Sequence, residues 1–296
     1  MGRRHYLFLF LLACAGCARP AFAAHPTVPP IATPATRNAA TVTVRFDLYR
    51  GYLIVAHGSA GPLKNLNFLL DTGTSVPIFD SEVAKRLRLA GDAPASIVIL
   101  GGRVQGANAV LPSLEFGPVQ RTSLPVVTTD LSFFQKLIPV RIDAVVGLDI
   151  LGQSPFVIDY SAQVIRFGPP PPFPVSVPLK LDGGLITFDA VIDHAPVHLA
   201  FDTGVASLVL FDQAASASNM KADAVQQTDQ IGSFPRKATR LRTVTLGDEQ
   251  FRQQSAILVS NPKQSQIDFD GLMSPPALGI SRVSVDLKGG ILAFSR

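Results

Sequence analysis

The sequence predicts an all-β protein made of two similar lobes, and three observations support this prediction. The chain of 296 residues is built from short apolar stretches separated by Gly, Pro, Asn and Asp, which favours many short strands and little helix. The tripeptide Asp-Thr-Gly occurs at residues 71–73 and again at 202–204, each time directly after an apolar run. Further features repeat in the same order around the two copies, so we expect two copies of one β-rich unit.

The repeat extends well beyond the tripeptides. Each half ends in a short hairpin in which an Asp and the closing Phe are 8 residues apart, at Asp159 and Phe167 and again at Asp286 and Phe294. A glycine that ends another apolar run follows the Asp of each tripeptide by 46 and 45 residues. Insertions between the two halves are therefore small.

Within the first half, runs that alternate apolar and polar residues, and runs that are wholly apolar, predict short strands followed by a closing hairpin. The candidate strands are Val42 to Leu48, Tyr52 to His57, Leu66 to Leu70, Ser96 to Leu100, Ala109 to Leu114 and the hairpin 156–167. One short helix is expected from Ser81, as its capping residue, to Leu87, with Val83, Ala84 and Leu87 on its apolar face. Its counterpart in the second half is expected at 212–216.

We divide the chain by composition into five segments. A Pro-rich stretch between the halves favours an extended, semi-rigid spacer, although a ligand for a proline-reading domain is an alternative. The expected segments are a leader at 1–23, a flexible tail at 24–41, an N-terminal lobe at 42–168, a Pro-rich linker at 169–178 and a C-terminal lobe at 179–296.

The amino terminus has the pattern of an export signal. Arg3 and Arg4 precede an apolar run, and Ala21-Phe22-Ala23 has the small-x-small form of a leader cleavage site. We therefore expect a periplasmic or extracellular protein. Cleavage after Ala23 removes three arginines and no acidic residue, which leaves 23 Lys and Arg against 22 Asp and Glu. Charge therefore gives no support for a nucleic-acid partner.

Both cysteines of the chain, Cys14 and Cys17, lie in this leader. The segments 11–14 and 14–17 resemble the bacterial lipobox, so a lipid anchor through Cys14 or Cys17 is an alternative to simple cleavage. A small Cys also fits an apolar leader without any such role. After the leader no thiol remains, which excludes cysteine catalysis and thiolate zinc sites.

Other catalytic patterns find little support. The five His residues form no His-Glu-x-x-His or similar metal motif, and we expect neither a metal nor a cofactor. Ser59 lies in the sequence His-Gly-Ser-Ala-Gly at 57–61, which lacks the spacing of a nucleophile elbow and reads better as a hairpin turn. After the leader, no apolar run reaches the 18 residues of a membrane helix.

Asp71 and Asp202, one in each half, are the candidate catalytic residues. Two carboxyl groups held about 3 Å apart cannot both ionise, so they share one proton between them. One then acts as base on a water molecule while the other protonates the carbonyl that the water attacks. Peptide hydrolysis by this route needs no metal, cofactor or covalent intermediate. The competing interpretation is that both loops merely close strands.

The residues around the tripeptides resemble a known family. Phe68-Leu69-Leu70-Asp71-Thr72-Gly73-Thr74-Ser75 resembles the active-site motif of aspartic proteases, and the later strand 143–147 resembles the retropepsin-like branch. The resemblance covers roughly residues 42–296. It implies two pseudo-symmetric acid-protease β-barrel lobes with the active site between them, so that a single chain forms what retroviral enzymes assemble as a homodimer.

The resemblance also implies roles for the residues beside the two carboxyl groups. Thr72 and Thr203 would interlock through hydroxyl-to-backbone hydrogen bonds, and Gly73 and Gly204 would let the backbones approach closely. Thr74 supplies the hydroxyl usual after the Gly. The second half departs from the family pattern at two positions. Val205, the counterpart of Thr74, has no hydroxyl, and Ser274 occupies the position that corresponds to Gly147 in the first half.

Two glycine-bearing segments are candidate flaps over the substrate. They are residues 99–104, with Gly101 and Gly102, and residues 231–235, with Gly232. Neither contains the flap tyrosine of the pepsin branch.

These observations predict an exported, monomeric aspartic endopeptidase acting on a peptide or protein substrate. The first alternative is a catalytically weak or inactive peptide-binding protein of the same fold in the cell envelope, since fold alone does not settle activity. The second is a structural factor associated with peptidoglycan or lipoproteins, which no motif favours.

Overall fold

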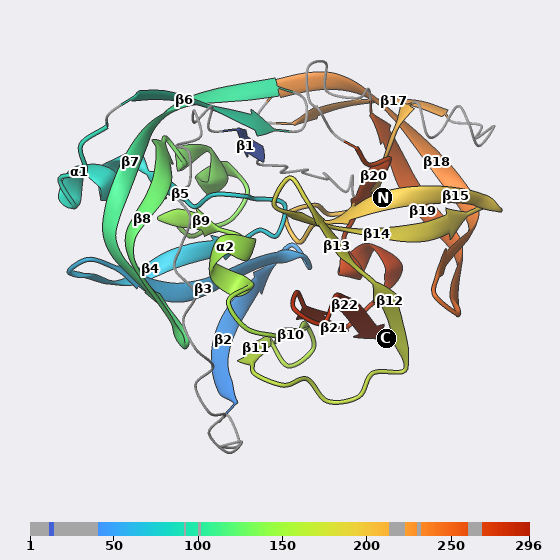
Figure 1. Ribbon diagram of the computed structural model, residues 1–296. Helices are drawn as coiled ribbons and strands as arrows, with labels where there is room; N and C mark the ends of the chain where they lie inside the picture. The colour runs from blue at the N-terminus through green and yellow to red at the C-terminus, as the bar shows by residue number, and fades with distance from the viewer. Residues whose placement is uncertain are drawn as a thin grey trace, which may run out of the picture.

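The computed structural model describes residues 12–14, 41–91, 93–99, 102–212, 223–229, 232–259 and 268–296. Within them strands predominate and only two short helices occur, as expected for an all-β fold, and Figure 1 shows two β-rich lobes side by side. Most of the expected leader and tail lies outside the described residues, as do Cys17, Gly101 and residues 213–216 of the second expected helix. No helix in the described part of the chain has the length and apolar character needed to cross a membrane.

The first lobe and its closing hairpin are formed by eleven strands and two helices. They are β1 Leu12–Cys14, β2 Val42–Tyr49, β3 Leu53–Ala60, β4 Leu63–Leu70, β5 Ile78–Asp80, α1 Ser81–Arg86, β6 Ala93–Ile99, β7 Gly102–Phe116, β8 Val119–Thr129, β9 Ala144–Val146, α2 Leu148–Leu151, β10 Phe156–Asp159 and β11 Val164–Phe167, with a 3-10 turn η1 at Ser132–Lys136.

The second lobe repeats this series. Its strands are β12 Val175–Pro178, β13 Lys180–Asp182, β14 Leu185–Ile192, β15 Ala195–Phe201, β16 Leu208–Phe211, β17 Asp223–Asp229, β18 Gly232–Leu246, β19 Glu249–Val259, β20 Gly271–Met273, β21 Arg282–Asp286 and β22 Ile291–Ser295, with a 3-10 turn η2 at Pro275–Leu278. The sequence assigned residues 169–178 to a linker. The last four of them form strand β12 instead, because they pair with β22.

The two lobes have the same strand order. In the first lobe the order is β6-β7-β8-β5-β9-β4-β3-β2, and a β7–β3 pairing closes the barrel. In the second it is β17-β18-β19-β16-β20-β15-β14-β13, closed by β18–β14. Strands at equivalent places pair in equivalent directions, so the repeat seen in the sequence is a repeat of topology.

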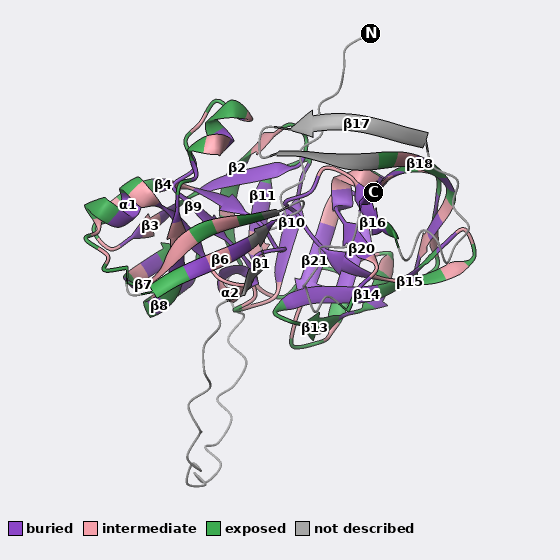
Figure 2. Cartoon of the chain, turned by 90° about the horizontal axis from the view of Figure 1, so that it is seen from above, coloured by how far each residue is buried: buried purple, intermediate pink, exposed green. Residues whose placement is uncertain are grey.

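The closing hairpins of the two halves pair with each other. Strand β10 lies antiparallel to β21, with Phe156 opposite Val285 and Asp159 opposite Arg282. Strands β2, β11, β10, β21, β22 and β12 therefore form one continuous sheet that joins the lobes. Figure 2 shows buried residues running through both lobes and along this junction.

Helix α1 forms where the sequence predicts it, but its capping residue differs. Asp80, not Ser81, is the N-cap, and its carboxylate accepts the backbone N–H of Glu82 at 3.0 Å. The Asp80 carboxylate also accepts the N–H of Leu131 and pairs with Arg141. The Asp80 carboxylate satisfies donors from several segments at once. Asp80 rather than Ser81 is therefore the N-cap. Val83 and Ala84 are buried, as expected.

Candidate active site

Each Asp-Thr-Gly loop leaves the end of a central strand in its lobe. Strand β4 runs parallel to β9, and β15 runs parallel to β20. The backbone N–H of Asp71 donates to the carbonyl of Val146 at 3.0 Å, and that of Asp202 donates to the carbonyl of Met273 at 3.0 Å. Equivalent backbone bonds therefore fix the two aspartates at equivalent places.

A second pair of aspartates anchors these strands. The Asp143 carboxylate accepts the N–H of Asn67 at 2.9 Å, and the Asp270 carboxylate accepts the N–H of His198 at 2.8 Å. Asn67 and His198 each precede the loop aspartate of their lobe by four residues. The sequence motifs did not assign a role to either aspartate. Their repeated occurrence, 72 and 68 residues after Asp71 and Asp202, was the available signal.

The two loops meet and interlock. The Thr72 hydroxyl donates to the carbonyl of Phe201 at 3.1 Å and accepts the N–H of Thr203 at 3.0 Å. The Thr203 hydroxyl donates to the carbonyl of Leu70 at 3.0 Å and accepts the N–H of Thr72 at 3.1 Å. These four buried bonds are the interlock that the family resemblance implies. They join residues about 130 positions apart and set the distance between the loops.

Glycine at both loop positions lets the carboxyl groups face each other. A Cβ placed on Gly73 would lie 2.7 Å from an Asp202 carboxyl oxygen, and one placed on Gly204 would lie 2.7 Å from the Asp71 carboxyl carbon. Any larger side chain would displace the opposite carboxyl group. Each glycine N–H donates to the aspartate of its own loop, at 2.8 Å for Gly73 and 2.7 Å for Gly204.

Both carboxyl groups are fully buried, and burial raises the pKa of each. For Asp71 the hydrogen bond from the Gly73 N–H offsets part of this rise. For Asp202 the negative charge of Asp71 adds to the effect of burial and raises the pKa well above its ordinary value. The two carboxyl groups therefore titrate as a coupled pair, and their burial beside each other disfavours a state in which both are ionised.

One oxygen of each carboxyl group has no hydrogen-bond partner within the protein. These atoms are Asp71 Oδ2 and Asp202 Oδ2, and the buried hydroxyls of Thr74 and Ser274 are likewise without partners. Thr74 stands close enough to Asp71 to contribute to lowering its pKa, although no bond of ordinary geometry forms. Buried acceptors of this kind are costly to leave unpaired and mark a site for a ligand or for water.

The two lobes differ beneath their loops. In the first lobe Gly147 is in such close backbone contact with Thr74 that a Cβ at Gly147 would collide with the Thr74 carbonyl. In the second lobe the corresponding residues are Ser274 and Val205, both fully buried. Val205 directly follows Gly204, and Ser274 follows Met273, whose carbonyl accepts the Asp202 N–H, so both departures adjoin the backbone of the second loop.

Both lobes carry a long hairpin at the places expected for flaps. Strands β6 and β7 pair up to Ile99 and Gly102, and β17 and β18 pair up to Asp229 and Gly232. Strands β7 and β18 each have 15 residues. The hairpin tips at 100–101 and 230–231 lie outside the described residues.

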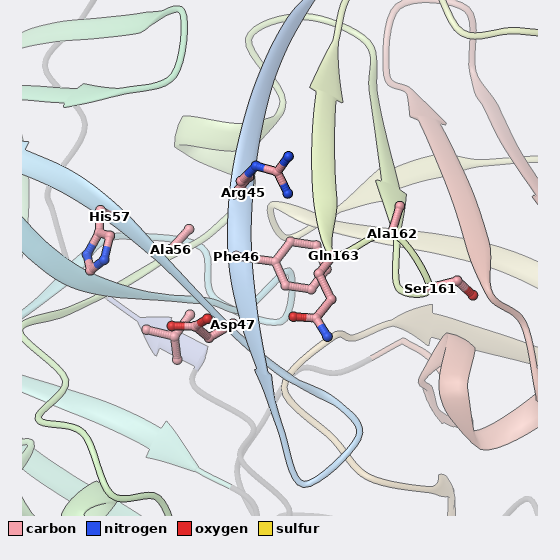
Figure 3. A pocket seen from close by; sticks show the side chains of 9 residues that line it. Arg45, Phe46, Asp47, Ala56, His57, Ser161, Ala162 and Gln163 are labelled. Atoms are coloured by element: carbon pink, nitrogen blue, oxygen red, sulfur yellow. The ribbon is translucent and has the colours of Figure 1, made fainter.

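A surface pocket of about 470 Å³ lies away from the loops (Figure 3). Its lining includes Arg45, Asp47, His57 and Gln163, and it contains no residue of either Asp-Thr-Gly loop. Among the described residues no group of three or more His, Cys, Asp or Glu side chains is placed to hold a metal ion.

Comparison with known proteins agrees with this geometry. Residues 57–150 match a protein family described as aspartyl protease. The match contains the first Asp-Thr-Gly loop, the first long hairpin and strand β9, which ends just before Gly147. It supports an aspartyl protease family for this chain. No curated protein matches the sequence.

Proposed function

We propose that this protein is an aspartic endopeptidase that hydrolyses peptide bonds with a water molecule activated between Asp71 and Asp202. The observation that carries the proposal is the pair of fully buried, mutually facing carboxyl groups, each with one oxygen that no protein group occupies. The family match of residues 57–150 supports the same reaction class.

We assign the roles of the two carboxyl groups from the Thr74 hydroxyl, which stands near Asp71 and lowers its pKa, whereas Val205 offers no hydroxyl at the equivalent place in the second loop. Ionised Asp71 takes a proton from the water, whose oxygen attacks the peptide carbonyl carbon, while protonated Asp202 gives its proton to the carbonyl oxygen. A diol forms. It collapses when one diol hydroxyl returns a proton to Asp202 and Asp71 passes its proton to the leaving nitrogen, so that the C–N bond breaks. Both aspartates end in their starting states.

The remaining loop residues position these groups. Thr72 and Thr203 hold the loops together, and the N–H groups of Gly73 and Gly204 orient the carboxylates. The β6–β7 and β17–β18 hairpins, whose second strands begin at Gly102 and Gly232, are proposed to cover a bound peptide and exclude water. We also propose that the enzyme acts as a monomer after export, either free after cleavage or anchored by lipid at Cys14 or Cys17.

A peptide library of mixed sequence tests the proposal against the inactive peptide-binding alternative. We expect cleavage products by mass spectrometry, and we expect a peptide with a hydroxyl isostere in place of the scissile bond to block their formation. Such an isostere mimics the diol and binds more tightly than substrate. Binding of the isostere without cleavage of any library peptide would favour the alternative.

A further inference from the structure

The pocket of Figure 3 lies where strand β2 changes its pairing partner. Residues 42–45 of β2 pair with β11, whereas residues 46–49 pair with β3. At this change the backbone N–H of Phe46 donates to the carbonyl of Gln163 at 3.1 Å, in the turn that joins β10 to β11. The cavity of about 470 Å³ is lined by residues 45–47, 55–57 and 161–163. Three segments that are held by strand pairing and turn bonds therefore form its walls.

Four polar side chains of this lining have no partner within the described part of the chain. They are Arg45, Asp47, His57 and Gln163, which are all exposed. No hydrogen bond or ion pair to a described residue engages any of these side chains. The arginine of the neighbouring strand β11 differs, because Arg166 lies 3.2 Å from the Asp159 carboxylate. The donors and acceptors of the pocket are therefore available to a ligand.

The opposite charges of the pocket are kept apart. Arg45 and Asp47 are two residues apart on β2, and Figure 3 shows the guanidinium and the carboxylate on opposite sides of that strand. Gln163 lies on the side of Arg45, and His57 lies on the side of Asp47. The remaining strand residues of the lining are apolar and buried, namely Phe46, Val55 and Ala56. The pocket thus has a cationic end, an anionic end and an apolar base.

This separation of charge indicates the kind of ligand that the pocket fits. A simple anion would leave the Asp47 carboxylate without a partner, and a simple cation would leave the Arg45 guanidinium without one. A short peptide with free ends satisfies both, because it carries a carboxylate at one end and an ammonium group at the other. Arginine binds carboxylates through two parallel hydrogen bonds. The volume of the cavity lies within the range of small-ligand sites.

We propose that this pocket binds short peptides by their two free ends. The peptide carboxylate binds Arg45 and the Gln163 amide, and the ammonium group binds Asp47, with His57 beside it. Peptides with free ends are also the products of the proposed hydrolysis, so the pocket gives the enzyme a second peptide site apart from the Asp-Thr-Gly loops. Binding at this site needs neither catalytic carboxyl group, so the inference stands independently of the proposed function.

Titration of the full chain with tri-alanine in an isothermal calorimeter tests the proposal. Free tri-alanine is compared with its N-acetylated and its C-amidated forms, each of which lacks one charge. We expect the free peptide to bind at least tenfold more tightly than either capped form, because each cap leaves one charge of the pocket without a partner. The titration is repeated with the hydroxyl-isostere peptide in excess. The affinity for tri-alanine should not change, because the two sites are separate.

Two variants assign each end of the peptide to its residue. Arg45→Gln should weaken binding of free tri-alanine at least tenfold and leave binding of the C-amidated form unchanged. Asp47→Asn should weaken binding of the free peptide to a similar extent and leave binding of the N-acetylated form unchanged. The matched controls are Lys180→Gln and Asp182→Asn, because these exposed residues of β13 also carry opposite charges two positions apart. Neither residue lines the pocket, so both control chains should bind tri-alanine as the parent does.

Four results would overturn the inference. They are no binding of free tri-alanine, equal affinity for the free and capped forms, displacement of tri-alanine by the hydroxyl isostere, and unchanged affinity in Arg45→Gln and Asp47→Asn chains whose circular dichroism matches the parent. The capped peptides decide the inference on the parent chain should a variant fail to fold. A chain that binds tri-alanine in the expected pattern but cleaves no library peptide would contradict the proposed function and support this inference.

Discussion

At the scale of single residues, the two facing carboxyl groups carry the proposed chemistry. Asp71→Asn and Asp202→Asn each keep side-chain shape but remove the base or the shared proton. We expect kcat/KM to fall by about 10³-fold or more in each variant, with the fold retained by circular dichroism. The double variant should be no worse than either single one, because the two residues act as a unit.

Asp182→Asn is the matched control for these variants, because Asp182 is an exposed residue of β13. Its kcat/KM should equal that of the parent. Substantial turnover by purified Asp71→Asn or Asp202→Asn would remove the assignment of the catalytic pair.

The asymmetry between Thr74 and Val205 makes a second prediction at this scale. A hydroxyl beside an ionised carboxylate lowers its pKa, so Thr74→Val should raise the pKa of Asp71 and move the acid limb of the kcat/KM profile toward neutral pH. Val205→Thr adds a hydroxyl beside Asp202, lowers its pKa and should move the profile toward acid. Profiles of kcat/KM against pH measure both shifts.

The two variants act as controls for each other, since their shifts have opposite signs. Profiles that overlay the parent, or shifts in the reversed directions, would show that these hydroxyls do not tune the pair.

At the scale of elements, α2 carries a carboxyl group that the proposed mechanism does not use. Burial raises the pKa of Asp149 to about 6, and the nearby backbone N–H of Ile150 offsets part of this rise, although neither carboxyl oxygen has a hydrogen-bond partner of ordinary geometry. The Arg121 guanidinium, from β8, lies near it and offsets part of this rise. Because α2 follows directly after Gly147, a change in its packing reaches the backbone beside Thr74.

We expect Asp149→Asn to stabilise the protein above pH 6. Between the ordinary pKa near 4 and the folded-state value of about 6, the unfolded chain loses its proton before the folded chain does, so the stability of the parent falls as pH rises through this window. The neutral amide side chain of the Asp149→Asn variant removes this loss of stability. Guanidinium unfolding should show a gain of ~1–3 kcal/mol at pH 7.5 and little difference at pH 3.5. An equal gain at both pH values would assign the effect to packing rather than ionisation.

At the scale of the whole molecule, both loops come from one chain, and one continuous sheet joins the two lobes that carry them. The closing hairpins pair through β10 and β21, and the Asp159 carboxylate of the first half lies 3.4 Å from Arg282 of the second. A second chain is therefore not needed to complete the pair of carboxyl groups.

Specific activity should accordingly stay constant on dilution, with a monomeric mass in analytical ultracentrifugation under the assay conditions. Activity that falls on dilution together with dissociation of a dimer would show that each chain supplies only half of a working site.

The sequence alone determined the fold class and the two carboxyl groups, because both are encoded locally. The Asp-Thr-Gly tripeptides follow apolar runs, and the spacing of the closing hairpins repeats, so pattern and period were sufficient to predict a two-lobed, all-β chain. Helix α1 was likewise predicted from its apolar face, although its cap was assigned one residue too late.

Only the tertiary structure decided what depends on contacts between distant segments. The bonds that join Thr72 and Thr203, the anchoring of strand β15 by Asp270 and the pairing of β1 with β6 connect residues between about 70 and 130 positions apart. No local pattern specifies such partners. The raised pKa of both Asp71 and Asp202 likewise comes from burial and from the nearness of the two groups, which exist only once the lobes meet.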